Sequence, residues 1–166
     1  MDRSAPSVLI AERSRHGNRY YACGPDNSIE TLIVIAVMEP LLSIQLYRQP
    51  AIYRPGDSMR CDYQIDAVEA EAIHAVEASV LWYTEGKGDE DMAVHYFERR
   101  VPHDAEESDL RPLHIFQTVL PNSPLSYTGQ ILQVRWCIRL RLFLKSGKEY
   151  CTERPFVLTA EPAPQG

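Results

Sequence analysis

The sequence lacks any apolar run long enough to cross a membrane as a helix. Such a helix needs roughly 18 or more apolar residues, whereas the longest run here, Leu32–Met38, is much shorter. Asp26 and Glu30 precede this run, and Glu39 and Pro40 follow it in place of a small-residue cleavage site. Because that order does not fit a signal peptide, we expect no membrane span and a cytoplasmic location.

Paired cysteine motifs are missing as well. None of the four cysteines, Cys23, Cys61, Cys137 and Cys151, forms a CxxC motif or lies at metal-ligand spacing from a histidine. The histidines share no HxH or HExxH spacing. We therefore expect free thiols that serve mainly as small apolar side chains, no metal site, and a reducing compartment.

No motif for nucleotide binding or hydrolysis is complete. Gly86-Lys87-Gly88 lacks the spacing of a phosphate-binding loop and the helix that would follow it. Ser126 lies in PLSYTG and not in the GxSxG turn of a hydrolase. The sequence thus offers no catalytic residue and no cofactor site, and we expect a protein that is not an enzyme.

Basic residues are too few to make nucleic acid the expected partner. The formal net charge of the 166 residues is −6, which repels both nucleic acid and anionic lipid on average. Acidic residues concentrate between Glu85 and Asp91. Two interpretations remain open there, a solvated hairpin or a site for a hard cation, and the hairpin is favoured because the spacing matches no known calcium loop.

The clearest positive signal is the alternation of apolar and polar residues in 131–144, ILQVRWCIRLRLFL. Successive side chains of a strand point to opposite faces, so Leu132, Val134, Trp136, Ile138, Leu140, Leu142 and Leu144 share one face. Similar patterns occur at 41–47, 59–66, 76–83, 93–101, 114–120 and 149–158. We expect Trp136 and Trp82 to lie in the centre of the core, because large aromatic side chains dominate cores.

Seven short strands without a long amphipathic helix predict an all-β fold, an immunoglobulin-like antiparallel sandwich. Within 93–101, strict alternation places His95 and Phe97 on one face and Val94 and Tyr96 on the other, without deciding which face is buried. Ala67–Ala72 is expected to be a connection, and Thr84–Asp91 a hairpin loop.

The ends of the chain differ from its middle. Residues 1–37 mix arginines with Ser, Asn, Gly and Pro and show no periodicity. We expect an irregular extension there, with Met38 as an alternative start, because strand patterning begins just after it. Residues 38–160 are expected to form a single sandwich domain, and 161–166 a loose tail.

Several short motifs occur in an order typical of one family. They are Tyr53-x-Pro55-Gly56-Asp57, Leu120-Pro121, Pro124-x-Ser126-Tyr127-x-Gly129, Val134-x-Trp136-x-Ile138 and Pro155-Phe156-Val157. With them, residues 41–158 resemble the N-terminal sandwich of arrestins, which arrestin-related retromer subunits and bacterial sporulation-control proteins share. The resemblance implies an arrestin-like fold and a role as a binding scaffold. It transfers no catalytic or receptor-binding residue, and the length suits one sandwich where arrestins have two.

Arg135, Arg139 and Arg141 project from the polar face of 131–144, with separations of roughly 7 and 13 Å along the strand. Such a row of guanidinium groups is able to bind carboxylates or phosphates of a partner. The other interpretation, which we favour, is that the arginines pair with acidic residues of neighbouring strands, for example Glu77 and Glu98.

The leading functional hypothesis is a non-enzymatic protein-interaction or scaffold module. It would act through its sheet faces, its loops or an exposed edge strand, and the same kind of edge would allow a homo-oligomer. The alternative is a sandwich that binds a small ligand or carbohydrate on exposed Tyr83, Tyr96 and Tyr127. An enzyme of unknown class, the least favoured hypothesis, requires a concave pocket with convergent polar groups.

Overall fold

The computed structural model describes residues 39–87, 90–102 and 109–160. All of them belong to the second of the two units into which the chain divides, Val37–Gly166. The expected N-terminal extension, 1–37, and the expected tail, 161–166, lie outside the described residues. No helix in the described part of the chain is long and apolar enough to cross a membrane.

All seven expected strands are present. The described residues form β1 (Leu41–Leu46), β2 (Ile52–Tyr53), β3 (Ser58–Asp66), β4 (Ile73–Gly86), β5 (Met92–Arg100), β6 (His114–Val119), β7 (Tyr127–Thr128), β8 (Leu132–Leu144) and β9 (Glu149–Leu158). One short 3-10 helix, η1 (Ala70–Ala72), lies in the expected connection before β4. The sequence patterns missed β2 and β7, because two residues are too few to show alternation.

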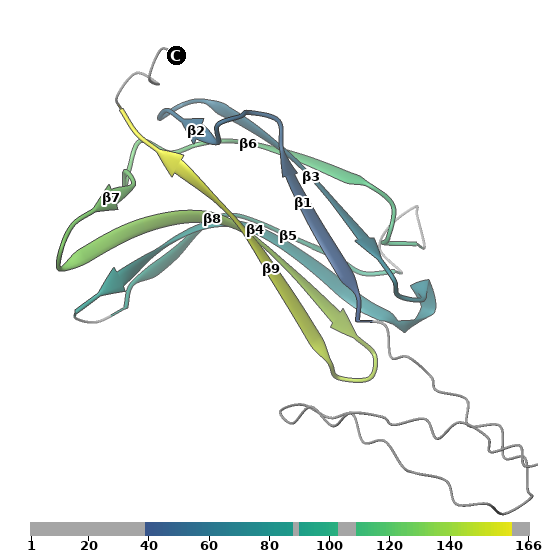
Figure 1. Ribbon diagram of the computed structural model, residues 1–166. Coiled ribbons are helices and arrows are strands. Elements are labelled where there is room, and N and C mark those ends of the chain that lie inside the picture. Colours follow the sequence, from purple (N-terminus) through teal and green to yellow (C-terminus); the bar gives the residue numbers. More distant parts are fainter. Residues whose placement is uncertain (1–38, 88–89, 103–108, 161–166) are drawn as a thin grey trace, which may run out of the picture. The chain divides into compact units, whose positions relative to one another are not determined.

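The strands form two layers (Figure 1). The small sheet has the order β1-β3-β6, and the large sheet has the order β2-β9-β8-β4-β5, with β7 added beside β8. This arrangement confirms the β-sandwich. The seven expected strands pair antiparallel, and only the additional two-residue β2 runs parallel, beside β9.

The core lies between the two layers and follows the alternation of the sequence. The small sheet contributes Met59, Cys61, Tyr63 and Ile65, none of them more than 2% exposed. The large sheet contributes Trp136, whose indole N–H donates to the Pro124 carbonyl at 2.9 Å. That bond satisfies the polar end of the indole, as a buried tryptophan requires.

Trp82 is less central than expected. It points to the same side of the large sheet as its β8 partner Trp136, but it is only partly buried and packs against the margin of the core. The strand that carries it is also longer than expected. Thr84, Glu85 and Gly86, assigned to a loop from their polarity, continue β4 because β8 extends to Leu132 and offers them backbone partners.

A bulge in β5 corrects the expected alternation of 93–101. Val80 pairs with Tyr96 and the next residue, Leu81, pairs with Val94, so His95 is an extra residue without a partner on β4. An extra residue shifts the alternation by one. Val94 and Phe97 consequently share the outer face of the large sheet, whereas His95 and Tyr96 both point inward.

Candidate functional site

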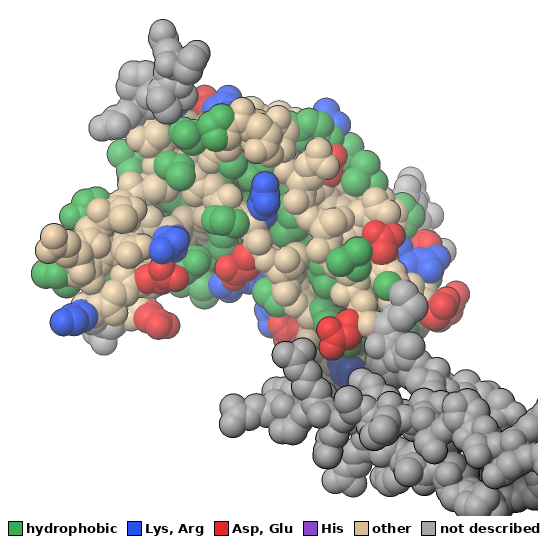
Figure 2. All heavy atoms as spheres, viewed as in Figure 1, with side chains coloured by type: hydrophobic (Ala, Val, Ile, Leu, Met, Phe, Trp, Pro, Cys, Tyr) green, Lys and Arg blue, Asp and Glu red, His purple; other side chains and the backbone are tan. Residues whose placement is uncertain are grey.

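The three arginines singled out in the sequence lie on the outer face of the large sheet, and each contacts a carboxylate of its own sheet. Arg139 Nε lies 2.7 Å from Glu153, and Arg141 contacts Glu149 at 2.7 Å and Glu77 at 3.2 Å. Arg135 forms an ion pair with Glu85. Figure 2 shows acidic and basic side chains next to one another beneath the large sheet.

Two of these pairs belong to a charge ladder that crosses four strands. Arg99 of β5 contacts Glu77 of β4, Glu77 contacts Arg141 of β8, and Arg141 contacts Glu149 of β9. The hydrogen bond from Arg141 lowers the pKa of Glu149. Cross-strand pairing is therefore observed for Arg141 and Glu77, as the favoured interpretation expected.

Glu98 does not take part in this ladder, and its expected pairing with the arginine row was wrong. Its strand partner is Ala78, which points into the core. Glu98 accordingly lies between the sheets, where it accepts hydrogen bonds from the hydroxyls of Tyr63 and Tyr96 and lies 3.2 Å from His114. The pattern could not show this, because it left the buried side of 93–101 undecided.

The two buried thiols of the described residues are not activated nucleophiles. Cys61 and Cys137 are free and buried, and burial raises the pKa of each to about 12. A thiol with so high a pKa carries almost no thiolate at neutral pH. Cys151 is exposed on β9, so the expectation that it packs as a small apolar residue was wrong; Cys23 lies outside the described residues.

The described part of the chain contains no group of three or more His, Cys, Asp or Glu that is able to hold a metal ion. In the acidic segment Glu85–Asp91, positions 88 and 89 are not among the residues that the structure describes. The Glu85 carboxylate pairs with Arg135, and the Asp91 carbonyl accepts a hydrogen bond from the Thr84 N–H at 2.8 Å. A solvated hairpin stays the favoured interpretation of this segment, and cation binding stays its alternative.

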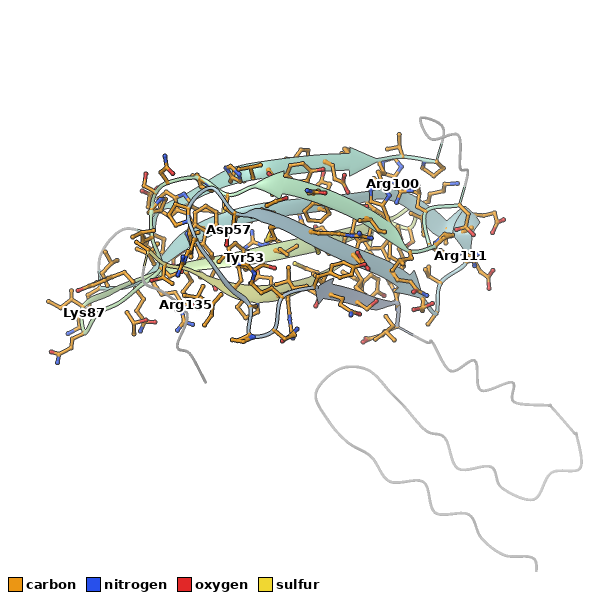
Figure 3. The ribbon with its side chains drawn as sticks, turned by 90° about the horizontal axis from the view of Figure 1, so that it is seen from above. Tyr53, Asp57, Lys87, Arg100, Arg111 and Arg135 are labelled. Carbon is orange, nitrogen blue, oxygen red and sulfur yellow. The ribbon has the colours of Figure 1, made fainter. Side chains whose placement is uncertain are left out.

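Two of the hollows on the surface of the described residues contain charged groups that already have partners. One has a volume of about 280 Å³ and contains Asp109 and Arg111, which bind each other at 2.8 Å. The other has a volume of about 380 Å³ and contains Arg48, which is bound to Asp57 and lies over the ring of Tyr53. Figure 3 shows Arg111 at one end of the sandwich, with Tyr53 and Asp57 towards the other.

Exposed aromatic rings do not form the flat row that carbohydrate binding would favour. Tyr83 lies on the outer face of β4 and is half-buried, and Tyr127 is exposed on β7. Tyr96 points inward, and its ring stacks on Phe116 with centroids 4.9 Å apart. The three tyrosines named in the sequence are thus not brought together.

Apolar side chains are instead exposed along the side of the sandwich where β5 and β6 lie. Each of these strands is the last of its sheet. Inward-facing groups connect them, including the Tyr96–Phe116 stack and a 2.8 Å hydrogen bond between His95 Nε2 and the Val119 carbonyl. Met92, Val94, Phe97, Leu113, Ile115 and Val119, all at least 43% exposed, form what we call the β5–β6 side.

The sequence patterns missed the β5–β6 side because they do not reveal which strand ends a sheet. Ile115 and Val119 were recognised as apolar residues of a strand, but an apolar residue on the outer face of an edge strand has the same sequence pattern as a core residue.

One polar group near Ile115 is unusual. Asp62, directly opposite Ile115, is buried under Tyr47, and its Oδ1 has no hydrogen-bond partner among the described residues.

Comparison with known proteins supports the fold and leaves the function open. No model of a known protein family matches the chain, and no curated protein matches its sequence. Among solved structures, the chain is similar to Spo0M, a sporulation control protein from Bacillus subtilis, with a TM-score of 0.53 and 13% sequence identity. The match covers 74% of this chain and 50% of that one, so this chain spans about half the length of Spo0M. The likeness confirms the arrestin-like sandwich.

Proposed function

We propose that this arrestin-like sandwich is a non-enzymatic protein-interaction module whose partner binds at β6. The observation that carries the proposal is the edge of β6, where Leu113, Ile115 and Val119 are 57%, 43% and 61% exposed. Exposed apolar groups close to one another are typical of a contact with another protein.

The partner segment is an extended strand that adds to the free edge of β6. β6 pairs with β3 on one edge, and no strand of the described residues pairs with the other. Ile115 and Val119 point to the outer face, with Gln117 between them. A segment with apolar residues at alternate positions would therefore place them beside Ile115 and Val119. Its backbone would pair with β6 before Val119, because the Val119 carbonyl is already bound by His95.

The other two functional hypotheses receive less support. A carbohydrate site needs aromatic rings that share a surface, and the tyrosines lie on separate faces. An enzyme needs convergent polar groups in a pocket, and the charged groups of the two hollows bind each other or their neighbours. We retain the cytoplasmic location as part of the proposal.

The test compares two doubly substituted variants. Ile115→Lys with Val119→Lys places charges on the edge of β6, a change that natural edge strands use to prevent pairing. The matched control, Ser43→Lys with Gln45→Lys, places the same charges on exposed positions of β1 at the other edge of the same sheet. Each protein is used to capture partners from a lysate of its source, followed by mass spectrometry.

The partner captured by the wild type and by the β1 control is expected to bind the β6 variant at least about tenfold more weakly. Its affinity is then measured by calorimetry with purified proteins. The same partner bound with unchanged affinity by a folded β6 variant would reject β6 as the site.

Recognition of an acidic partner by Arg135, Arg139 and Arg141 stays a prediction. We expect these arginines to contribute little to partner binding, because their guanidinium groups already pair with carboxylates of the same sheet. The variant Arg139→Glu with Arg141→Glu should keep the affinity of the captured partner within about twofold, because the guanidinium groups belong to the sheet's own ion pairs. If a variant with wild-type stability lost binding, the three arginines would instead be assigned to partner recognition.

A further inference from the structure

The free edge of β5 has a symmetry of its own. No strand of the described residues pairs with it. Because of the bulge, Met92 and Val94 point to the outer face, His95 and Tyr96 point inward, and Phe97 points outward again. Glu98 then points inward and Arg99 outward. The order of faces is therefore the same when the strand is read in either direction from the midpoint between His95 and Tyr96.

The charges of β5 have the opposite symmetry. Glu90 and Asp91 precede the strand, and Arg99 and Arg100 end it. When two such strands lie antiparallel, the acidic start of one meets the basic end of the other. In a parallel arrangement like charges would meet, which is unfavourable.

We propose that two copies of this chain pair through β5 as antiparallel strands about the midpoint between His95 and Tyr96. The large sheets of the two copies thereby form one continuous sheet. Val94 of each copy lies opposite Phe97 of the other on the outer face, and Asp91 lies opposite Arg100. This inference goes beyond the proposed function, which concerns β6 and a different protein.

The bulge fixes the register of this pairing. In a regular strand, a slip of two residues again places like faces opposite each other. Here a slip of two in one direction places outward Val94 opposite inward His95, and a slip in the other direction places inward Tyr96 opposite outward Phe97. Only the register centred between His95 and Tyr96 keeps every face matched, as expected for a bulge that pins a strand.

The apolar side chains supply the contact. Met92, Val94 and Phe97 are 53%, 50% and 56% exposed in the single chain. A second β5 covers their edge-facing surface and pairs the open backbone of the strand, which is the usual way in which an exposed edge is satisfied.

The test uses the full chain and two single substitutions that are complementary only in this register. Val94→Lys and Phe97→Glu each place a charge opposite an apolar residue of the second copy, twice in a symmetric dimer. Each variant is expected to dimerise at least about tenfold more weakly than the wild type in sedimentation equilibrium over a concentration series. When the two variants are mixed, the introduced lysine of one faces the introduced glutamate of the other, and the remaining Phe97 faces the remaining Val94. A one-to-one heterodimer is therefore expected.

Gln45→Lys on β1, an exposed position away from β5, is the control and should dimerise like the wild type. Far-ultraviolet circular dichroism checks that each variant is folded. Should either apolar variant fail to fold, Glu90→Lys with Asp91→Lys tests the charge symmetry in its place, and weaker dimerisation is again expected.

Three results would overturn the proposal: a wild-type chain that is monomeric throughout the series, single variants that dimerise normally, or a mixture that gives no heterodimer. These results are distinguishable from failure of the proposed function. Substitution of β5 removes the dimer and leaves capture of the β6 partner, whereas Ile115→Lys with Val119→Lys removes capture and leaves the dimer.

Discussion

At the level of single residues, the polar groups of this sandwich are mostly occupied by the chain itself. Asp57 shows how. Its carboxylate accepts the backbone N–H of Arg54 at 3.0 Å and binds the guanidinium of Arg48. These interactions lower the pKa of Asp57, the backbone hydrogen bond contributing most. The carboxylate thereby fixes the turn between β2 and β3, in which Gly56 has a φ of 80°.

The lowered pKa of Asp57 leads to a prediction for acid. The unfolded carboxyl has a pKa of about 3.9, so the stabilisation is fully present above that pH and is lost as the pH falls through the lower folded pKa. Asp57→Asn should therefore reduce stability at neutral pH and flatten the fall in stability in acid. Urea unfolding across a pH series measures both.

Arg48→Met serves as the comparison. This variant should also flatten the fall in stability in acid, but by less than Asp57→Asn, because the Arg54 N–H still binds Asp57. An Asp57→Asn protein whose stability falls with acid as steeply as the wild type would contradict the assignment.

Among the elements, the length of β4 depends on what lies beside it. Gly86 ends the strand with a φ of 148°, and a Cβ added there would lie 2.1 Å from the Ile131 carbonyl oxygen. The adjacent Lys87 N–H donates to that same oxygen at 3.0 Å. Glycine is thus required for β4 to stay paired with the beginning of β8. Figure 3 shows Lys87 and Arg135 at this end of the molecule.

Gly86→Ala should destabilise the protein by about 2 kcal/mol or more, since strain at positive φ and a backbone clash add together. Hydrogen exchange at the Lys87 amide should rise because its acceptor is displaced. Gly147→Ala is the control: Gly147 has a φ of 83° but open space around it, so the cost should be about 1 kcal/mol. Equal costs for the two variants would show that the close approach to Ile131 is unimportant.

In the molecule as a whole, the buried hydrophobic core of the described residues extends from Leu46 to Leu158. Its strands come from both ends of that range, and the two ends meet where β2 pairs with β9. A core assembled in this way is closed by contacts between distant parts of the chain. The proposed domain, 38–160, contains all of these strands.

A chain that begins at Met38 should therefore fold like the full chain. Thermal unfolding followed by circular dichroism should give a Tm within about 5 °C of the full-length value, equivalent to roughly 1 kcal/mol. A larger loss would show that residues 1–37 stabilise the sandwich. The separate expectation that Met38 is the natural start is tested by the intact mass of the natively expressed protein, and a mass that matches residues 1–166 would contradict it.

The strands and most of the core follow from the amino-acid sequence alone. Alternation with period two is a local property, so it identified both faces of 131–144 and placed Trp136 in the interior. The order of short turn motifs was enough to indicate the arrestin-like fold. Local pattern also indicated that Arg141 and Glu77 would find opposite charges across strands, although it could not give the register that brings them to 3.2 Å.

Where the sheets end, and what that exposes, is a property of the folded chain. Which strand lies at an edge depends on pairing between distant segments, and no window of sequence contains it. The bulge at His95 likewise arises because β4 and β5 differ by one residue over the paired stretch, a mismatch that neither strand shows alone. That one residue turns Val94 and Phe97 to the same face and so creates the surface we propose for a second copy. The edge of β6 that we propose for another protein follows from the strand order. Neither surface is visible without the tertiary structure.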